Sequence, residues 1–143
     1  MSIDINLEMA PSINEVRRIT TLVDLLRVRA LEQPDRNAYT FIKDDEQEVC
    51  WTYGELDRRA RSIAASLQTL GAQGERVLLL YPPGLEYIAA FFGCLYAGMI
   101  AVPIYPPRSN RNFERIQSVV ADADAKFILT TNTVVSRNEV TSI

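Results

Sequence analysis

The longest apolar stretch of the chain constrains the fold most. From Leu85 to Ile104 the only charged residue is Glu86. About twenty such residues are enough to cross the hydrocarbon core of a bilayer. The same stretch also has the length of a helix followed by a strand in a soluble domain. The fold, and with it the class of function, depends on which of these two structures forms.

Turn residues inside the stretch favour the soluble alternative. Gly98 suits the left-handed residue that ends many helices, and Pro103 suits the end of a strand or the edge of a sheet. Both residues would interrupt a membrane helix, and no basic cluster marks a cytoplasmic flank. We therefore expect a helix over Leu85–Ala97 and a buried strand in "MIAVPI".

The neighbouring segments continue this alternation of helix and strand. "RVLLLY" before the helix and "KFILT" near the end of the chain are short apolar runs typical of buried strands. "FERIQSVVADA" lies between them and has apolar residues at helical spacing. The pattern predicts an α/β fold with a parallel βαβαβ unit, whose strands are apolar because helices cover both faces. We expect a soluble, cytoplasmic protein without a membrane span.

A helix and a hairpin are predicted ahead of this unit. "TLVDLLRVRALEQP" has its leucines at helical spacing, with Thr20 or Thr21 as the cap, Asp24 near the positive end of the helix dipole and Pro34 at the close. "NAYTFI" and "EVCWTY" have the composition of short strands, and "KDDEQ" between them is a charged turn. The two strands are therefore expected to pair as a hairpin.

The segment "TYGE" starts the best-marked helix. Thr52 and Glu55 have the spacing of a capping box, in which each side chain bonds a free N–H of the other residue. Gly71 is expected to end this helix in the left-handed conformation. One face of the helix is apolar, carrying Leu56, Ala60, Ile63, Ala64, Leu67 and Leu70.

Three arginines, Arg58, Arg59 and Arg61, occupy the remaining faces of that helix. They form either a phosphate-binding patch or a solvated helix face. The second interpretation is favoured, because their side chains lie opposite the apolar stripe.

Composition excludes several classes of site and partner. The 143 residues carry a net charge of -3 and no histidine. An acidic chain argues against nucleic acid or anionic lipid as the main partner. The lack of histidine removes the commonest general base and metal ligand.

Cys50 and Cys94 lack a metal-ligand spacing and are expected to be two buried, reduced thiols. Residues 1–19 do not resemble a secretory signal, and a loosely ordered leader is expected there.

Ligands of open parallel sheets bind beyond the carboxyl ends of the strands. Those ends carry "YPPG" (81–84), "YPPR" (105–108) and "TTNT" (130–133). The two aromatic-proline corners form either a rigid wall for an apolar or carboxylate ligand, or simple strand ends with tyrosines covering the core. The sequence contains no phosphate loop and no nucleophile elbow. Taken alone, the residues therefore indicate no catalytic, cofactor-binding or metal-binding site.

Two blocks of the sequence resemble a known enzyme superfamily. "TYGELDRRARSIAASLQTLGAQGERVLLL" resembles the opening motif region of adenylate-forming enzymes, and "FFGCLYAGMIAVPIYPP" looks like their next shared block. "YPPGLEYIAAFFGCLYAG" followed by "YPPR" most resembles the fatty acyl-AMP ligases. Fatty acyl-CoA ligases tend to have a less aromatic, lysine-bearing version at the position of Tyr96. The resemblance covers roughly residues 21–131.

The resemblance implies that residues 20–143 are the first part of a large amino-terminal domain, incomplete at its carboxyl end. Such enzymes use ATP and Mg²⁺ to convert a fatty acid into an acyl-adenylate. The acyl group then passes to an acyl carrier protein of a lipid or polyketide pathway. The family's phosphate loop, ribose-binding aspartate, hinge and carboxyl-terminal lysine all belong further along the chain. No catalytic residue is therefore carried over to this sequence.

Several expectations follow for the isolated chain. It should be inactive, should not bind ATP or Mg²⁺ tightly, and should self-associate through sheet edges that a parent enzyme would cover. Thr52, Glu55, Gly71, Gly98 and the proline corners are then structural residues. Two alternatives stay open at this point: a fragment of a fatty acyl-CoA ligase, and a standalone binding or docking module.

Overall fold

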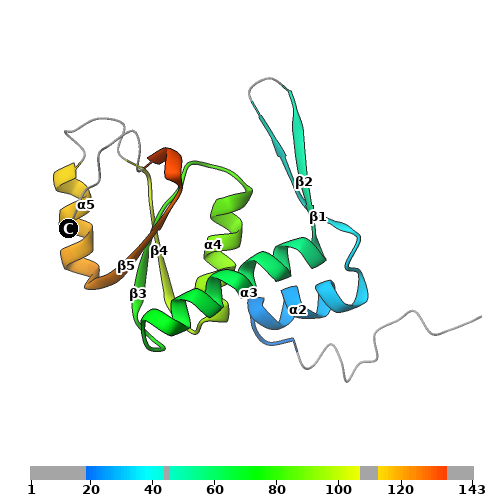
Figure 1. The fold of residues 1–143 in the computed structure, drawn as a ribbon, viewed down its shortest axis with the longest axis horizontal. Coiled ribbons are helices and arrows are strands. Elements are labelled where there is room, and N and C mark those ends of the chain that lie inside the picture. The colour runs from blue at the N-terminus through cyan, green and yellow to red at the C-terminus, as the bar shows by residue number, and fades with distance from the viewer. Residues whose placement is uncertain (1–18, 44–45, 107–112, 135–143) are drawn as a thin grey trace, which may run out of the picture.

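The computed structural model describes residues 19–43, 46–106 and 113–134. The leader predicted for residues 1–19 lies outside this part of the chain, apart from Ile19. The elements follow the predicted order (Figure 1): α2 (Leu22–Glu32), β1 (Asn37–Ile42), β2 (Glu48–Thr52), α3 (Tyr53–Leu70), β3 (Arg76–Leu80), α4 (Leu85–Tyr96), β4 (Ile100–Ile104), α5 (Phe113–Ala123) and β5 (Ala125–Thr130).

The apolar stretch forms α4 and β4, which confirms the predicted helix and strand. Strands β3, β4 and β5 make a parallel sheet in the order β4-β3-β5. In the register, Leu78 of β3 lies between Val102 of β4 and Ile128 of β5. Pro103 lies on an outer strand of this sheet, as its missing N–H requires. Within the described residues, no helix is both long and apolar enough to cross a membrane.

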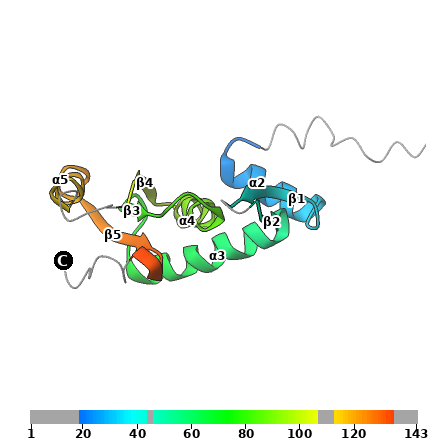
Figure 2. The same ribbon diagram turned by 90° about the horizontal axis from the view of Figure 1, so that it is seen from above.

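Helices cover both faces of the sheet, which explains why β3 is apolar throughout. Val77 and Leu79 pack against α3 and α4, while Leu78 and Leu80 pack against α5. All four side chains are buried. Figure 2 shows α5 separated from α3 and α4 by the strands. The predicted βαβαβ unit with two covered faces is therefore confirmed.

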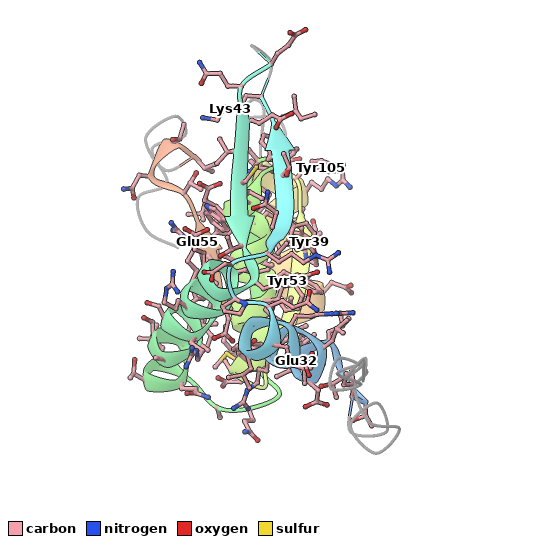
Figure 3. The ribbon with its side chains drawn as sticks, turned by 90° about the vertical axis from the view of Figure 1, so that its right-hand side faces the viewer. Glu32, Tyr39, Lys43, Tyr53, Glu55 and Tyr105 are labelled. Atoms are coloured by element: carbon pink, nitrogen blue, oxygen red, sulfur yellow. The ribbon has the colours of Figure 1, made fainter. Side chains whose placement is uncertain are left out.

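The predicted hairpin pairs β1 and β2 antiparallel, with Thr40 opposite Cys50. It projects away from α2 and α3, with Lys43 near its tip (Figure 3). A second core joins the hairpin and α2 to the rest of the molecule through Leu26, Trp51, Leu56, Leu85 and Ala89. Leu26 is the only fully buried residue of α2, so most of the predicted leucine face remains exposed.

Both predicted helix starts have complete capping boxes. In α3 the Thr52 N–H donates to Glu55 Oε2 at 2.9 Å, and the Glu55 N–H donates to Thr52 Oγ1 at 3.2 Å. In α2 the cap is Thr21, and the Asp24 N–H donates to its hydroxyl at 3.0 Å. The Asp24 pKa is lowered, first by the Thr21 hydroxyl and then by the Thr20 backbone, because both donate to its carboxylate.

The two glycines predicted to end helices behave differently. Gly98 has φ +72°, the left-handed conformation predicted for it. The prediction for Gly71 is wrong, because its φ and ψ are -157° and -179°, which is extended backbone. Gly71 is instead required by space, since a Cβ there would collide with the Phe127 ring and the Glu75 carboxylate. Leu70, placed on the apolar face by its spacing, is 65% exposed.

Candidate functional site

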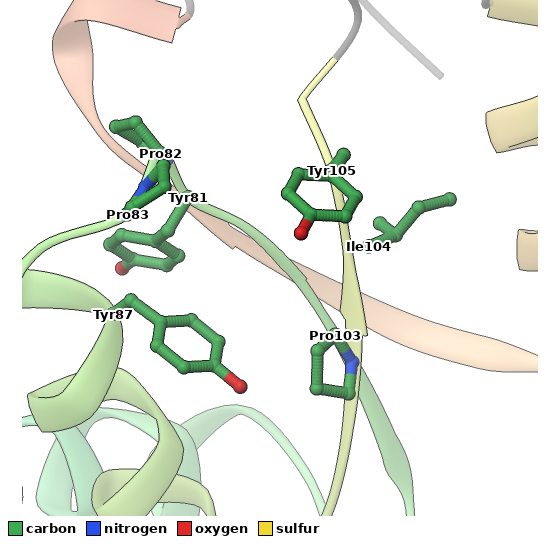
Figure 4. Close-up of a pocket in the computed structure, with 7 residues that line it drawn as sticks. All are labelled: Tyr81, Pro82, Pro83, Tyr87, Pro103, Ile104 and Tyr105. Atoms are coloured by element: carbon green, nitrogen blue, oxygen red, sulfur yellow. The ribbon is translucent and has the colours of Figure 1, made fainter.

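A cavity of about 350 Å³ lies at the carboxyl ends of β3 and β4. Figure 4 shows Tyr81 and Tyr87 facing Pro103 and Tyr105 across it. The lining residues come from the end of β3, from α4 and from the end of β4: Tyr81, Pro82, Pro83, Tyr87, Pro103, Ile104 and Tyr105. The cavity therefore brings the first aromatic-proline corner and part of the second together, as the parallel arrangement predicts.

The strand order explains why a cavity forms at this place. After β3 the chain passes through α4 on one face of the sheet to reach β4. After β4 it passes through α5 on the other face to reach β5, on the far side of β3. The two connections leave the sheet in opposite directions, which opens a crevice between the ends of β3 and β4. This is the position at which open α/β sheets bind ligands.

The chemistry of the cavity is apolar and aromatic. Among the described residues, its lining has three phenol groups and no charged side chain. Burial, and secondarily the charges of Cys94 and Glu86, raise the pKa of Tyr81, so its hydroxyl stays neutral at physiological pH. These described residues suit an apolar ligand. Within the described residues, no cluster of acidic side chains and cysteines is arranged to hold a metal ion.

The third strand end, "TTNT" (130–133), does not line the cavity. Thr130 ends β5, and its hydroxyl donates to the Leu80 carbonyl at 2.7 Å, so it ties β5 to β3. Pro107 and Arg108 lie outside the described residues. The interpretation of the tyrosines as core cover holds for Tyr81, which packs on the core between the sheet and α4. The ligand wall stays a prediction. Tyr105 is 77% exposed.

Sequence reasoning missed Tyr87, which completes the cavity from the first turn of α4. Its position two residues after Leu85, the first buried residue of the helix, was the available signal. A helix that begins directly after the β3 corner must place its first turn beside that corner.

A second cavity, of about 240 Å³, lies between α2 and α3. Arg27 reaches it from α2, and Asp57, Arg58 and Arg61 reach it from α3. The three arginines of α3 are exposed, as predicted. Arg59 lies elsewhere, with its guanidinium carbon 4.1 Å from the centre of the Trp51 ring. The helix face is therefore solvated, and two of its arginines also line a groove.

Asp57 is a buried carboxylate that sequence reasoning missed. The Tyr96 hydroxyl donates to Asp57 Oδ1 at 2.8 Å, and the Arg61 guanidinium lies 2.5 Å from Asp57 Oδ2. Burial and this hydrogen bond raise the pKa of Tyr96 well above its usual range. The available signal was the place of Asp57 beside Leu56 and three residues before Ala60, on the apolar stripe. Its partner on α4 is 39 residues away.

The two cysteines differ in environment. Both are free thiols. Cys94 is buried, and burial raises its pKa to about 11. The prediction that Cys50 is also buried is wrong, because β2 turns it to the exposed face of the hairpin. There its sulfur lies 3.3 Å from the Thr40 hydroxyl of the paired strand. Neither thiol lines either cavity.

Comparison with known proteins identifies similar chains. A family model described as AMP-binding enzyme matches residues 26–143. A medium-chain-fatty-acid–[acyl-carrier-protein] ligase, JamA of Moorena producens, is 50% identical over 115 residues, which is 78% of this chain. A putative fatty-acid–CoA ligase, FadD21 of Mycobacterium tuberculosis, is 42% identical over 120 residues, which is 80% of this chain.

A solved structure matches the fold. It is the crystal structure of a fatty acyl-adenylate ligase from Legionella pneumophila in complex with acyl adenylate and pyrophosphate. The two chains are 41% identical, with a TM-score of 0.82 over 90% of this chain and 22% of that one. The chain spans about a fifth of the length of the two curated relatives.

Proposed function

Because the chain belongs to the AMP-binding enzyme family, we propose that it is the opening segment of a fatty acyl-AMP ligase. Its α/β fold, with a hairpin and a three-stranded parallel sheet, matches the amino-terminal part of adenylate-forming enzymes. The similarity to the acyl-carrier-protein ligase is the observation that carries the proposal. The parent enzyme would use ATP and Mg²⁺ to make an acyl-adenylate and would pass the acyl group to an acyl carrier protein.

In this proposal the segment is a scaffold. The parent reaction is an attack of a carboxylate oxygen on the α-phosphorus of ATP. It depends on positioning of the reactants and on cations that offset the developing charge. The described lining of the carboxyl-end cavity is apolar and aromatic. The resemblance places the phosphate loop and the other chemical motifs further along the parent enzyme, so the chain alone is proposed to be inactive.

Exposed apolar side chains support a larger parent. Leu70 at the end of α3 is 65% exposed and Tyr105 at the end of β4 is 77% exposed. Ile100 also leaves much of its side chain open on β4, an outer strand of the sheet. Soluble proteins seldom leave strand edges and apolar patches uncovered, so further chain is expected to pack there. Without it, the segment is expected to self-associate.

The second candidate is a fatty acyl-CoA ligase, which the similarity to FadD21 favours. The two candidates share the adenylation step and differ in the acceptor of the acyl group. Tyr96 supports the acyl-AMP branch, because the resemblance places a lysine-bearing block at that position in the CoA ligases.

The acceptor decides between the two candidates. The full protein that contains this segment is incubated with ATP, Mg²⁺ and a labelled fatty acid, and then receives either CoA or a phosphopantetheinylated acyl carrier protein. We expect acyl-adenylate to form in both incubations. We expect the acyl group to be transferred to the carrier protein and not to CoA. Transfer to CoA would instead identify a CoA ligase. Absence of any acyl-adenylate would refute both candidates.

A further inference from the structure

The groove between α2 and α3 concentrates positive charge on an acidic chain. Its charged lining consists of Arg27, Arg58, Arg61 and Asp57, a net charge of +2, whereas the whole chain carries -3. The remaining lining residues are small or apolar and come from α2, from the loop after it and from the start of α3: Ala30, Leu31, Pro34 and Gly54. The groove shares no element with the carboxyl-end cavity of β3, α4 and β4.

Two of the three guanidinium groups lack an ion pair within the part of the chain that the structure describes. Among the described residues, Arg27 and Arg58 form no ion pair, and only Arg61 is paired, with Asp57. The acidic residues in the first turns of both helices are engaged elsewhere. The Asp24 carboxylate accepts from the Thr21 N–H, and the Glu55 carboxylate accepts from the Thr52 N–H. The groove therefore keeps unpaired cationic donors.

The floor of the groove is fixed. Asp57 is held by the Tyr96 hydroxyl at 2.8 Å and by Arg61, which fixes the guanidinium of Arg61 in turn. Arg58 and Arg61 are three residues apart and so share one side of α3. Arg27 faces them from α2. The charges of Arg27 and Arg61 both act to lower the pKa of Tyr96, against the larger effects of burial and Asp57, which places both guanidinium groups near that hydroxyl.

We propose that the groove between α2 and α3 binds a phosphate monoester. A guanidinium group presents a planar fork of N–H donors that matches two phosphate oxygens at once. A phosphate monoester carries a charge of about -1.5 to -2 at pH 7. This charge offsets the net charge of +2 on the lining. The space of about 240 Å³ holds a phosphate group with a short carbon chain, and Ala30, Leu31 and Pro34 supply an apolar wall for that chain. The binding site does not depend on the ligase activity.

Charge variants test the contribution of each helix. Binding of butyl phosphate to the full protein is measured by titration calorimetry at low ionic strength. Arg58→Gln removes an exposed, unpaired charge on α3 and should weaken binding about five- to tenfold. Arg27→Gln removes the unpaired charge on the α2 side and should weaken binding about as much. Arg115→Gln on α5 is the matched control, since Arg115 is also an exposed helix arginine, and it should leave binding unchanged.

Three results would overturn the proposal. Equal losses in Arg58→Gln and Arg115→Gln would show diffuse attraction to the whole surface. Unchanged binding in Arg27→Gln would show that α2 does not contribute to the site. Acetate that binds as tightly as butyl phosphate would show that the site does not select phosphate.

Two further measurements complete the test. Arg58→Lys keeps the charge without the planar fork and should bind more weakly than wild type, while its circular dichroism spectrum should match. Flotation with phosphatidate vesicles distinguishes a free ester from a lipid headgroup. We expect the protein not to float with these vesicles. Flotation that Arg58→Gln abolishes would assign the phosphate to a lipid and refute the free ester.

Discussion

Replacing Gly98 tests how the chain passes from α4 into β4. Gly98 has φ +72°, and its N–H donates to the Leu95 carbonyl at 3.0 Å. The next N–H, that of Met99, donates to the Cys94 carbonyl at 2.9 Å, and Met99 is buried. The left-handed residue thus ends the helix and directs the chain into the sheet. A residue with a side chain at this position either adopts the left-handed conformation at a cost in stability, or changes conformation and loses both hydrogen bonds.

The magnitude follows from backbone and contact terms. A left-handed non-glycine residue costs about 1–2 kcal/mol. The smaller conformational freedom of alanine in the unfolded chain offsets about 0.4–1 kcal/mol of this. We therefore expect Gly98→Ala to destabilise the protein by about 1 kcal/mol, and Gly98→Val by about 2 kcal/mol because of its branched Cβ. The added Cβ lies 3.1 Å from Cγ of Gln73, an exposed side chain that can move, so the contact adds little.

Thermal unfolding of the full protein measures the effect. Because the shift in Tm per kcal/mol falls as a domain grows, 1 kcal/mol corresponds to at most about 3 °C in the Tm of the larger full protein. Gly98→Asn should cost less than Gly98→Ala, because asparagine tolerates the left-handed region. Gly74→Ala is the matched control for the backbone cost alone, since Gly74 has φ +82° and no atom lies within 4 Å of the added Cβ. A Gly98→Val protein as stable as wild type would refute this account of the helix end.

Three further predictions concern Tyr96 and the two cysteines. Tyr96→Phe should destabilise the protein by about 1.5–3 kcal/mol in urea unfolding, because Asp57 loses a buried donor, whereas Tyr87→Phe should change stability little. In native protein a thiol reagent should modify the exposed Cys50 and spare Cys94, and Cys50→Ser should abolish the reaction. Because the folded-state pKa of Cys94, about 11, exceeds its ordinary value of 9.0, the folded protein retains the proton longer than the unfolded chain. Stability contributed by this thiol is therefore full below pH 9 and falls between pH 9 and pH 11, and Cys94→Ala should lose that dependence.

The elements that could be predicted from the sequence are those determined by residues close together in the chain. The capping box of Thr52 and Glu55 requires only residues three apart, so its spacing predicted the start of α3. The apolar strands followed from the need to cover both faces of a parallel sheet. The left-handed Gly98 followed from its position directly after an apolar helix.

Features that depend on contacts between distant residues could not be predicted from the sequence. Gly71 has a helix-ending position, but what it provides is space for Phe127 of β5. The burial of Asp57 depends on Tyr96, which reaches it from another helix. The exposure of Cys50 depends on which face of the hairpin packs against the core. In the candidate site, the two strand ends were predictable from topology, whereas the contribution of α4 depended on the direction in which that helix leaves the sheet.

Fatty-acid-dependent exchange of labelled pyrophosphate into ATP tests the central claim most directly, because this exchange reports acyl-adenylate formation itself. It is measured on the full protein that contains this segment and, in parallel, on residues 1–143 alone. The account predicts exchange by the full protein and none by the segment. A full protein without fatty-acid-dependent exchange would contradict the ligase assignment, and exchange by the segment alone would contradict its role as a scaffold.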